Sequence, residues 1–193
     1  MIPKVNLRMT ASSRTFLKSA PSPAELQKTI DGLWGRDDVS VILFVAACLD
    51  AALESLLKAK FVQLSKDEYK LLFDGSAGGL LGSLSAKIRI SFAMGLLTPD
   101  QEYDLNIIAG LRNVFAHSLP SITTTTTEVS QGADRLKQAK LVRIKNANIL
   151  LNQDNPRFKI IITFQCLYGV LRFLSGDRRF VTGGVTVEVP PSP

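Results

Sequence analysis

Apolar residues recur at three- and four-residue spacing through most of the chain, which predicts helices rather than strands. The clearest stripe predicts a long helix from Asp37 or Asp38 to about Phe61 and consists of Val41, Phe44, Val45, Cys48, Ala52, Leu56 and Ala59. A second helix is expected from Ser83 or Ser85, with Leu84, Ile88, Phe92 and Leu96 on its apolar side. A third follows Asn155-Pro156, although its stretch Ile160 to Phe164 also has the composition of a strand.

Residues that begin helices mark two further elements. Ser22-Pro23-Ala24-Glu25 supplies a cap, a first-turn proline and an acid, and predicts a helix to about Leu33. Thr98-Pro99-Asp100-Gln101 places glutamine three residues after the cap, as a capping box requires, and predicts a helix to about His117. We also expect a short helix over residues 66–73, followed by a loop over residues 74–79.

The remainder of the chain carries weaker signals. Residues 119–131 contain Pro120 and the run Thr123 to Thr127, which predicts a loop or an edge strand. Residues 133–151 fit a basic helix or an extended pair, and Gly183-Gly184 suggests a hairpin. The fold class is therefore mainly α, a bundle of five or six helices, with minor β structure after residue 119. We expect a flexible leader over residues 1–20, one helical domain over residues 21–180, and a C-terminal hairpin or tail over residues 181–193.

Composition limits the classes of function. The chain has 193 residues, of which 46% are hydrophobic and 21% charged, as in a globular protein with a real core. One histidine and two cysteines exclude a disulfide framework and the usual structural zinc sites, so we expect no metal and no cofactor. The N-terminal residues lack an apolar stretch after their basic residues, so we expect no signal peptide, and we expect the longest apolar runs to be too short to span a membrane. We expect a cytoplasmic protein in which Cys48 and Cys166 are reduced core thiols.

The net charge of +6 is concentrated in one part of the chain. Residues 1–134 contain 13 basic and 14 acidic residues, whereas residues 135–193 contain 10 basic and 3 acidic ones. A cationic region favours a nucleic acid or an acidic protein as partner. The alternative is a solvated helix face followed by a basic tail, since the basic residues are scattered among apolar ones.

The helix that ends at His117 carries the candidate site. At 100° per residue its apolar side is formed by Ile108, Leu111 and Phe115. The opposite side is polar and contains Asn106, Gly110, Asn113 and His117. Glycine in mid-helix costs about 1 kcal/mol against alanine, and close approach of another helix is one reason to keep it. Asn106, Gly110 and Asn113 therefore predict the interface of a homodimer or helix pair. The alternative is a solvent face that ends in a histidine suited to the helix dipole.

Arg112, Asn113 and His117 also suit phosphodiester chemistry. Histidine exchanges a proton near neutral pH, arginine holds phosphate oxygens, and asparagine can orient either the histidine or the substrate. No metal is needed when an RNA 2′-hydroxyl is the nucleophile. These three residues are the candidate catalytic group.

Two family resemblances follow from these residues. Arg112-Asn113-x-x-x-His117 resembles the signature of the HEPN superfamily, which implies a helical bundle and, in active members, dimers whose paired motifs form a metal-independent ribonuclease. A longer stretch, about Leu72 to Ser118, is similar to the mannitol operon repressor family (MtlR). This second likeness rests on Asp74-Gly75, the run Leu81 to Ile88, Gly95-Leu96-Leu97, Tyr103, and Leu111-Arg112 to His117. It implies a helical regulator that lacks an obvious helix-turn-helix and acts through partners.

Three hypotheses follow. The first is a regulatory protein of the mannitol-repressor type that acts through protein partners or nucleic acid. The second is a HEPN-type endoribonuclease, a toxin or phage-defence effector, in which Arg112 and His117 meet their copies across a dimer. The third is a scaffold in which the motif only ends a helix. The glycine-containing loop at Gly75 to Gly79 lacks the lysine of a phosphate-binding loop and is expected to be a turn.

Overall fold

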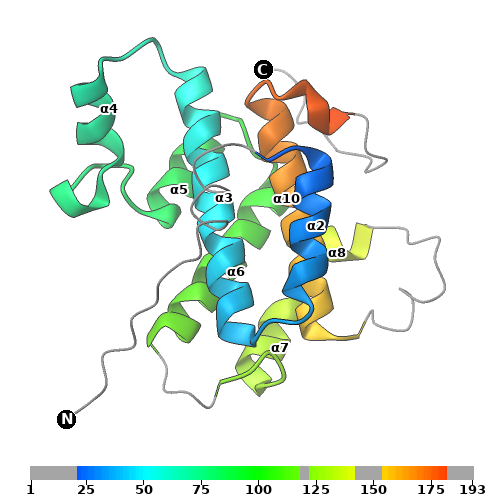
Figure 1. Ribbon diagram of the computed structural model, residues 1–193. Coiled ribbons are helices and arrows are strands. Elements are labelled where there is room, and N and C mark those ends of the chain that lie inside the picture. Colours follow the sequence, from blue (N-terminus) through cyan, green and yellow to red (C-terminus); the bar gives the residue numbers. More distant parts are fainter. Residues whose placement is uncertain (1–20, 118–121, 142–153, 182–193) are drawn as a thin grey trace.

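The computed structural model describes residues 21–117, 122–141 and 154–181, and these residues form a helical bundle (Figure 1). The elements, in chain order, are α2 (Pro23–Leu33), α3 (Asp38–Lys60), α4 (Lys66–Phe73), the 3-10 helix η1 (Gly75–Ala77), α5 (Leu84–Ala93), α6 (Pro99–His117), α7 (Thr127–Asp134), α8 (Gln138–Leu141), α10 (Pro156–Leu174) and the 3-10 helix η2 (Arg178–Val181). The predicted mainly α class is confirmed. All six predicted helices are present, and the short α7 and α8 come in addition.

The predicted capping residues begin the helices. At α2 the Ser22 backbone N–H donates to Glu25 Oε2 at 2.7 Å, and the Glu25 backbone N–H donates to Ser22 Oγ at 3.3 Å. At α6 the Thr98 backbone N–H donates to the Gln101 side chain at 2.9 Å, and the Gln101 backbone N–H donates to Thr98 Oγ1 at 3.3 Å. Each pair satisfies donors that the first turn of a helix leaves free.

Helix α3 lies at the centre of the bundle, against α5, α6 and α10 (Figure 1). Its buried side chains include most of the predicted stripe and are Val41, Ile42, Val45, Ala46, Cys48, Leu49, Ala52, Leu53, Leu56 and Leu57. By length and composition α3 could also cross a membrane, but 50% of its most apolar stretch is buried inside the bundle. An apolar helix buried on several sides is what the core of a helical bundle requires.

After residue 119 the described residues follow the loop and helix alternatives rather than the predicted β structure. The described residues there contain no strand. Ile160 to Phe164 lie within α10, because the apolar face needed against α3 repeats with a helical period. The threonine run forms a turn and the start of α7, since Thr124 is fixed by Asp38 rather than by a neighbouring strand. Of residues 133–151, the described part forms the end of α7 and α8. The predicted leader, the Gly183-Gly184 hairpin and residues 142–153 lie outside the described residues.

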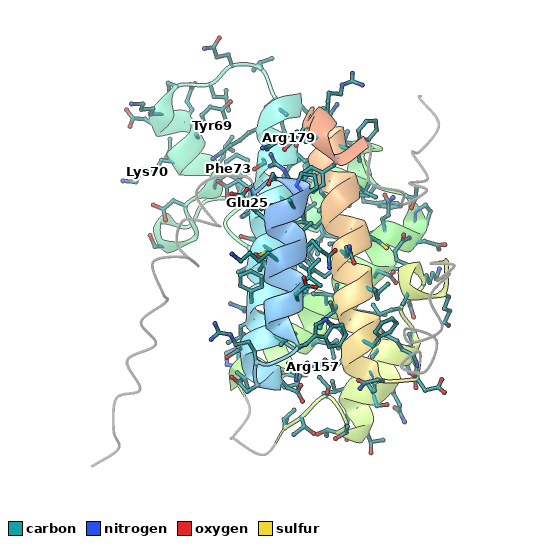
Figure 2. All side chains as sticks on the ribbon, turned by 45° about the vertical axis from the view of Figure 1, so that its right-hand side comes forward. Glu25, Tyr69, Lys70, Phe73, Arg157 and Arg179 are labelled. Atoms are coloured by element: carbon teal, nitrogen blue, oxygen red, sulfur yellow. The ribbon has the colours of Figure 1, made fainter. Side chains whose placement is uncertain are left out.

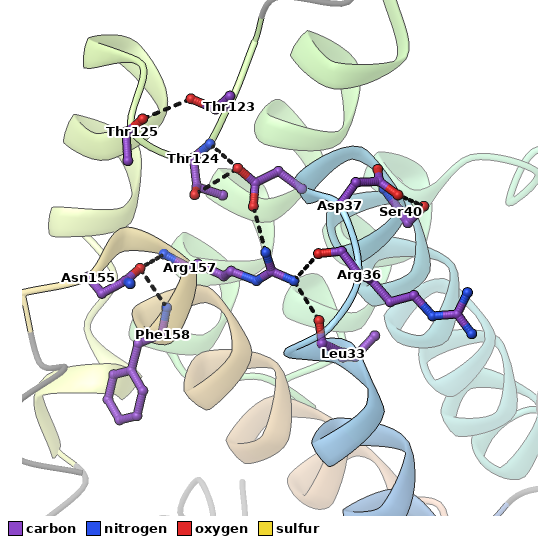
Figure 3. A network of polar contacts seen from close by, with 11 residues as sticks. Leu33, Arg36, Asp37, Ser40, Thr123, Thr124, Thr125, Asn155, Arg157 and Phe158 are labelled. Carbon is purple, nitrogen blue, oxygen red and sulfur yellow. Dashed lines mark hydrogen bonds and ion pairs between the residues drawn. The ribbon is translucent and has the colours of Figure 1, made fainter. Parts of the chain in front are cut away.

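A polar network joins α10 to the turn before α3 (Figure 3). Arg157 reaches Asp38 Oδ1 at 3.1 Å and the Leu33 carbonyl at 2.5 Å, and it also donates to the Arg36 carbonyl. The second oxygen of Asp38 accepts from the Thr124 backbone N–H at 2.7 Å. Three segments far apart in sequence are therefore fixed to one another by one guanidinium and one carboxylate.

Helix α4 and η1 form a small unit beside the end of α3 (Figure 1). Phe73 and Leu81 form an apolar cluster with Leu57 of α3, separate from the main core, which holds this unit against α3. Its loop is tight, because a Cβ added to Gly82 would lie 2.4 Å from Gly75 Cα. Only glycine allows the two backbone segments to approach this closely.

Candidate functional site

The predicted polar side of α6 faces outward. Asn106, Gly110, Asn113 and His117 are all exposed, whereas Ile108, Leu111 and Phe115 are buried in the main core. The helix therefore has the two faces that its periodicity indicates. We call Asn106, Gly110, Asn113 and His117 the α6 surface.

Gly110 lies at the middle of the α6 surface, and no described residue packs against it. A Cβ added there would have no neighbour within 4 Å. By contrast, a Cβ on Gly132 of α7 would lie 3.2 Å from a Leu111 methyl group, so that glycine serves packing within the chain. The helix approach predicted at Gly110 is therefore not made by the described part of this chain.

The three candidate catalytic residues are only partly brought together. Arg112 Nη1 donates to Asn113 Oδ1 at 3.0 Å, and both side chains are exposed. His117 is exposed at the last position of α6, and no described residue forms a hydrogen bond with its side chain. Among the described residues, this arrangement offers a histidine and an arginine that are both exposed to solvent.

Ion pairs neutralise much of the basic last third. Five of its eight described basic side chains pair with a carboxylate, and the pairs are Lys137–Asp100, Arg157–Asp38, Lys159–Asp134, Arg172–Asp177 and Arg179–Asp177. Their partners come from α3, α6, α7 and the turn before η2. The charge surplus thus serves contacts within the bundle, and it weighs against a continuous cationic surface for nucleic acid.

A buried lysine, which sequence reasoning missed, joins α5 to α3. Lys87 is 2% exposed, and its Nζ lies 2.8 Å from Asp50 Oδ2 and 3.0 Å from Glu54 Oε2. Burial opposes the ionisation of Glu54, but hydrogen bonds from Lys58 and Lys87 outweigh it and lower the pKa of that carboxyl. The available signal was the position of Lys87, which lies beside Ile88 on the apolar side of its helix.

Asp104 is a second buried charge that positions part of the bundle. Its side chain is fully buried in α6, and its two oxygens accept from the backbone N–H groups of Lys137 and Gln138, each at 2.8 Å. Burial raises the pKa of Asp104, although these two hydrogen bonds act in the opposite direction. Asp104 therefore fixes the start of α8 against α6, a role that no local pattern indicates.

The two cysteines are buried and free, as predicted. Burial raises the pKa of Cys166 to about 11 and raises that of Cys48 further. Both thiols are therefore protonated near neutral pH and poor nucleophiles. Among the described residues, no group of three or more histidine, cysteine, aspartate or glutamate side chains could hold a metal ion.

Comparison with solved structures identifies the type of fold. No protein-family model and no curated protein matches the sequence. Among solved structures, the chain is similar to MtlR in the X-ray structure of the MtlR–HPr complex from Escherichia coli, with a TM-score of 0.60 and 18% sequence identity. The alignment covers 77% of this chain and 98% of that chain. The chain therefore has an MtlR-like fold.

Proposed function

We propose that this protein is a regulator that acts by binding other proteins rather than by catalysis. The observation that carries this proposal is the similarity of its fold to MtlR, a protein whose structure was determined in complex with HPr. The exposure of Arg112, Asn113 and His117 within the described part of a single chain is consistent with this proposal. We expect the protein to act in the cytoplasm, without a membrane or a cofactor.

HPr is the first partner to test, because it is bound to MtlR in that complex. Purified protein titrated with purified HPr from Escherichia coli should show saturable binding by isothermal titration calorimetry. Heats of mixing that equal those of dilution, for a folded protein, would contradict HPr as the partner. Binding of an RNA instead, with an affinity that falls steeply with salt, would contradict regulation through protein contacts.

We further propose that the α6 surface joins two copies of the chain. Gly110 lies at the middle of the surface, and Asn106 and Asn113 lie one turn away on either side. In an antiparallel pair of α6 helices, each asparagine would therefore face the other asparagine of the second copy. A two-fold pair of this kind is self-complementary, as symmetric interfaces must be. The absence of a side chain at Gly110 would allow the two helices to approach closely.

Gly110→Ala tests this interface sharply, because stability and self-association should move in opposite directions. The added methyl group has space within the described chain, and alanine favours the helix over glycine. The free energy of unfolding should therefore rise by up to about 1 kcal/mol, and the variant should unfold at a higher temperature. In a dimer the same methyl group would separate the helices and weaken self-association. Sedimentation velocity should therefore show more monomer.

Gly32→Ala is the matched control, since Gly32 is also helical, exposed and without a neighbour within 4 Å. It should stabilise the protein in the same sense and leave the oligomeric state unchanged. Equal self-association of the wild-type protein and Gly110→Ala would refute the α6 surface as the interface.

The ribonuclease hypothesis makes a different prediction from the same surface. It requires that Arg112 and His117 from two copies meet around a phosphodiester and that both be indispensable for cleavage. The regulatory proposal requires neither. Cleavage of RNA in the presence of EDTA therefore separates the two hypotheses without knowledge of the partner.

A further inference from the structure

A small unit at one end of the bundle buries little of its surface. Residues 65–82, which we call the α4 flap, comprise α4, η1 and the loop that ends at Gly82. Phe73 is the buried side chain of α4, whereas Leu71 and Leu80 are 70% and 80% exposed. Figure 1 shows α4 beside the end of α3, away from α2 and α10. A segment with few buried apolar contacts opens at a lower free energy than the core of the same protein.

The backbone of the α4 flap is tied to itself. The Leu81 backbone N–H donates to the Leu72 carbonyl at 2.7 Å, and the Gly79 N–H donates to the Asp74 carbonyl at 2.9 Å. The Gly82 N–H donates to the Gly79 carbonyl at 2.9 Å. These hydrogen bonds close the loop onto the end of α4, so we expect the helix and the loop to move together.

One small apolar cluster holds the α4 flap against α3. Leu57 of α3 packs with Phe73 and Leu81 of the flap, separately from the main core. Phe61, just after α3, adds a ring whose centroid lies 6.2 Å from that of Phe73. Because this cluster is separate from the main core, the flap can detach while the other helices stay packed.

Lys58 adds a polar contact between α3 and the flap. Its Nζ lies 2.6 Å from Glu54 Oε1, and the second oxygen of Glu54 accepts from the buried Lys87 at 3.0 Å. The Lys58 ammonium also lies 5.5 Å from the centroid of the Tyr69 ring and 5.1 Å from that of Phe73. Figure 2 shows both rings on the side of α4 that faces α3. Since aromatic faces attract cations, the ammonium joins a fixed carboxylate of α3 to two rings of the flap.

We propose that the α4 flap opens from α3 as one unit while the rest of the bundle stays folded, and that Lys58 holds it closed. Opening separates the rings of Tyr69 and Phe73 from the ammonium. It also exposes the cluster of Leu57, Phe73 and Leu81, which are 0%, 9% and 8% exposed in the closed state. This step goes beyond the proposed function and does not depend on the identity of any partner. A molecule that binds only the open state would shift the chain toward it.

Native-state hydrogen exchange of the full chain tests the proposal. NMR resolves single amides at a pH where the exchange rate reports the equilibrium of opening, and the urea dependence reports the surface that each opening exposes. Lys58→Met removes the charge and keeps most of the stem, whereas Lys58→Arg keeps a cation. Lys60→Met is the matched control, because Lys60 is exposed in the same last turn of α3. Val45→Ala weakens the main core, in which Val45 is 0% exposed.

The proposal expects the α4 amides to exchange at least about tenfold faster than the buried amides of α10, with a weaker dependence on urea. Lys58→Met should accelerate the α4 amides about three- to tenfold, whereas Lys58→Arg and Lys60→Met should leave them within about twofold of the wild-type rate. Val45→Ala should accelerate the α10 amides at least about tenfold. It should leave the α4 amides unchanged, because opening of the flap does not break the contacts of Val45.

Two kinds of result would overturn the proposal. Parallel acceleration of the α4 and α10 amides by Val45→Ala would mean that α4 exchanges only when the whole chain unfolds, so the flap would not open separately. Equal exchange of the α4 amides in Lys58→Met and the wild-type protein would overturn the role of Lys58. An acceleration by Lys58→Arg as large as that by Lys58→Met would do the same, because the cation would then not be what holds the flap.

Discussion

Replacement of the buried Lys87 by alanine should destabilise the protein by about 3–4 kcal/mol. Lys87 is 2% exposed and lies between the carboxylates of Asp50 and Glu54, at 2.8 and 3.0 Å. Its removal leaves two carboxylates one turn apart on α3 without the cation between them. Among the described residues, no group forms a hydrogen bond with the buried Asp50 Oδ1.

The magnitude combines two parts. Removal of one partner of a buried ion pair typically costs about 3–5 kcal/mol. Here the side chains of Asp50 and Glu54 are 35% and 29% exposed, so water can solvate them and about 1–2 kcal/mol is the more suitable figure. Loss of roughly three buried methylene groups of the lysine stem adds about 2 kcal/mol.

Lys87→Met separates these two parts, because methionine fills most of the space of the stem and carries no charge. It should therefore cost only about 1–2 kcal/mol. The assay is urea unfolding followed by circular dichroism, with the midpoints compared at unchanged slope. Lys28→Ala on the exposed side of α2 is the control and should change stability by less than about 0.5 kcal/mol. Equal stability of Lys87→Ala and the wild-type protein would refute the account of a buried, paired lysine.

Three further predictions concern the rest of the bundle. Gly82→Ala should destabilise by about 1–3 kcal/mol in the same assay, because the added Cβ would overlap backbone atoms, whereas Gly32→Ala should not destabilise. Hydrogen bonds from Arg179 lower the pKa of Asp177 below its ordinary value of 3.8. The contribution of this carboxylate to the free energy of unfolding is therefore complete above pH 3.8. It is lost as the pH falls through the lower pKa of the native state. Unfolding midpoints measured across acidic pH should therefore fall less steeply for Asp177→Asn. Burial raises the pKa of Cys166 to about 11, so this thiol should react with Ellman's reagent only after the protein unfolds.

Local sequence signals predicted most of the helices for a physical reason. Capping residues such as Ser22, Thr98 and Asn155 act on backbone groups within four residues, so their effect can be inferred without the fold. The stripe in α3 is equally direct, because its apolar side chains must be buried together. The threonine run could not be inferred in this way, since its turn depends on Asp38, 86 positions from Thr124.

The buried charges were beyond sequence reasoning for the same reason. Lys87 and Asp50 are 37 positions apart, and Arg157 and Asp38 are 119 apart. A lysine or an arginine with a partner this distant has the same local sequence as a solvated one. The α6 surface is intermediate, because helical periodicity predicts its polar side correctly, whereas the proposed packing of a second helix at Gly110 has no signal within the chain's local sequence.

The central claim, regulation through protein contacts without catalysis, is tested most directly by an RNA-cleavage assay in EDTA. Total RNA and transfer RNA are incubated with the wild-type protein, Arg112→Ala and His117→Ala. Both variants should fold normally, since the two side chains are exposed. The account predicts that the wild-type protein leaves RNA intact and is indistinguishable from both variants. Cleavage by the wild-type protein that persists in EDTA and is lost in both variants would contradict it.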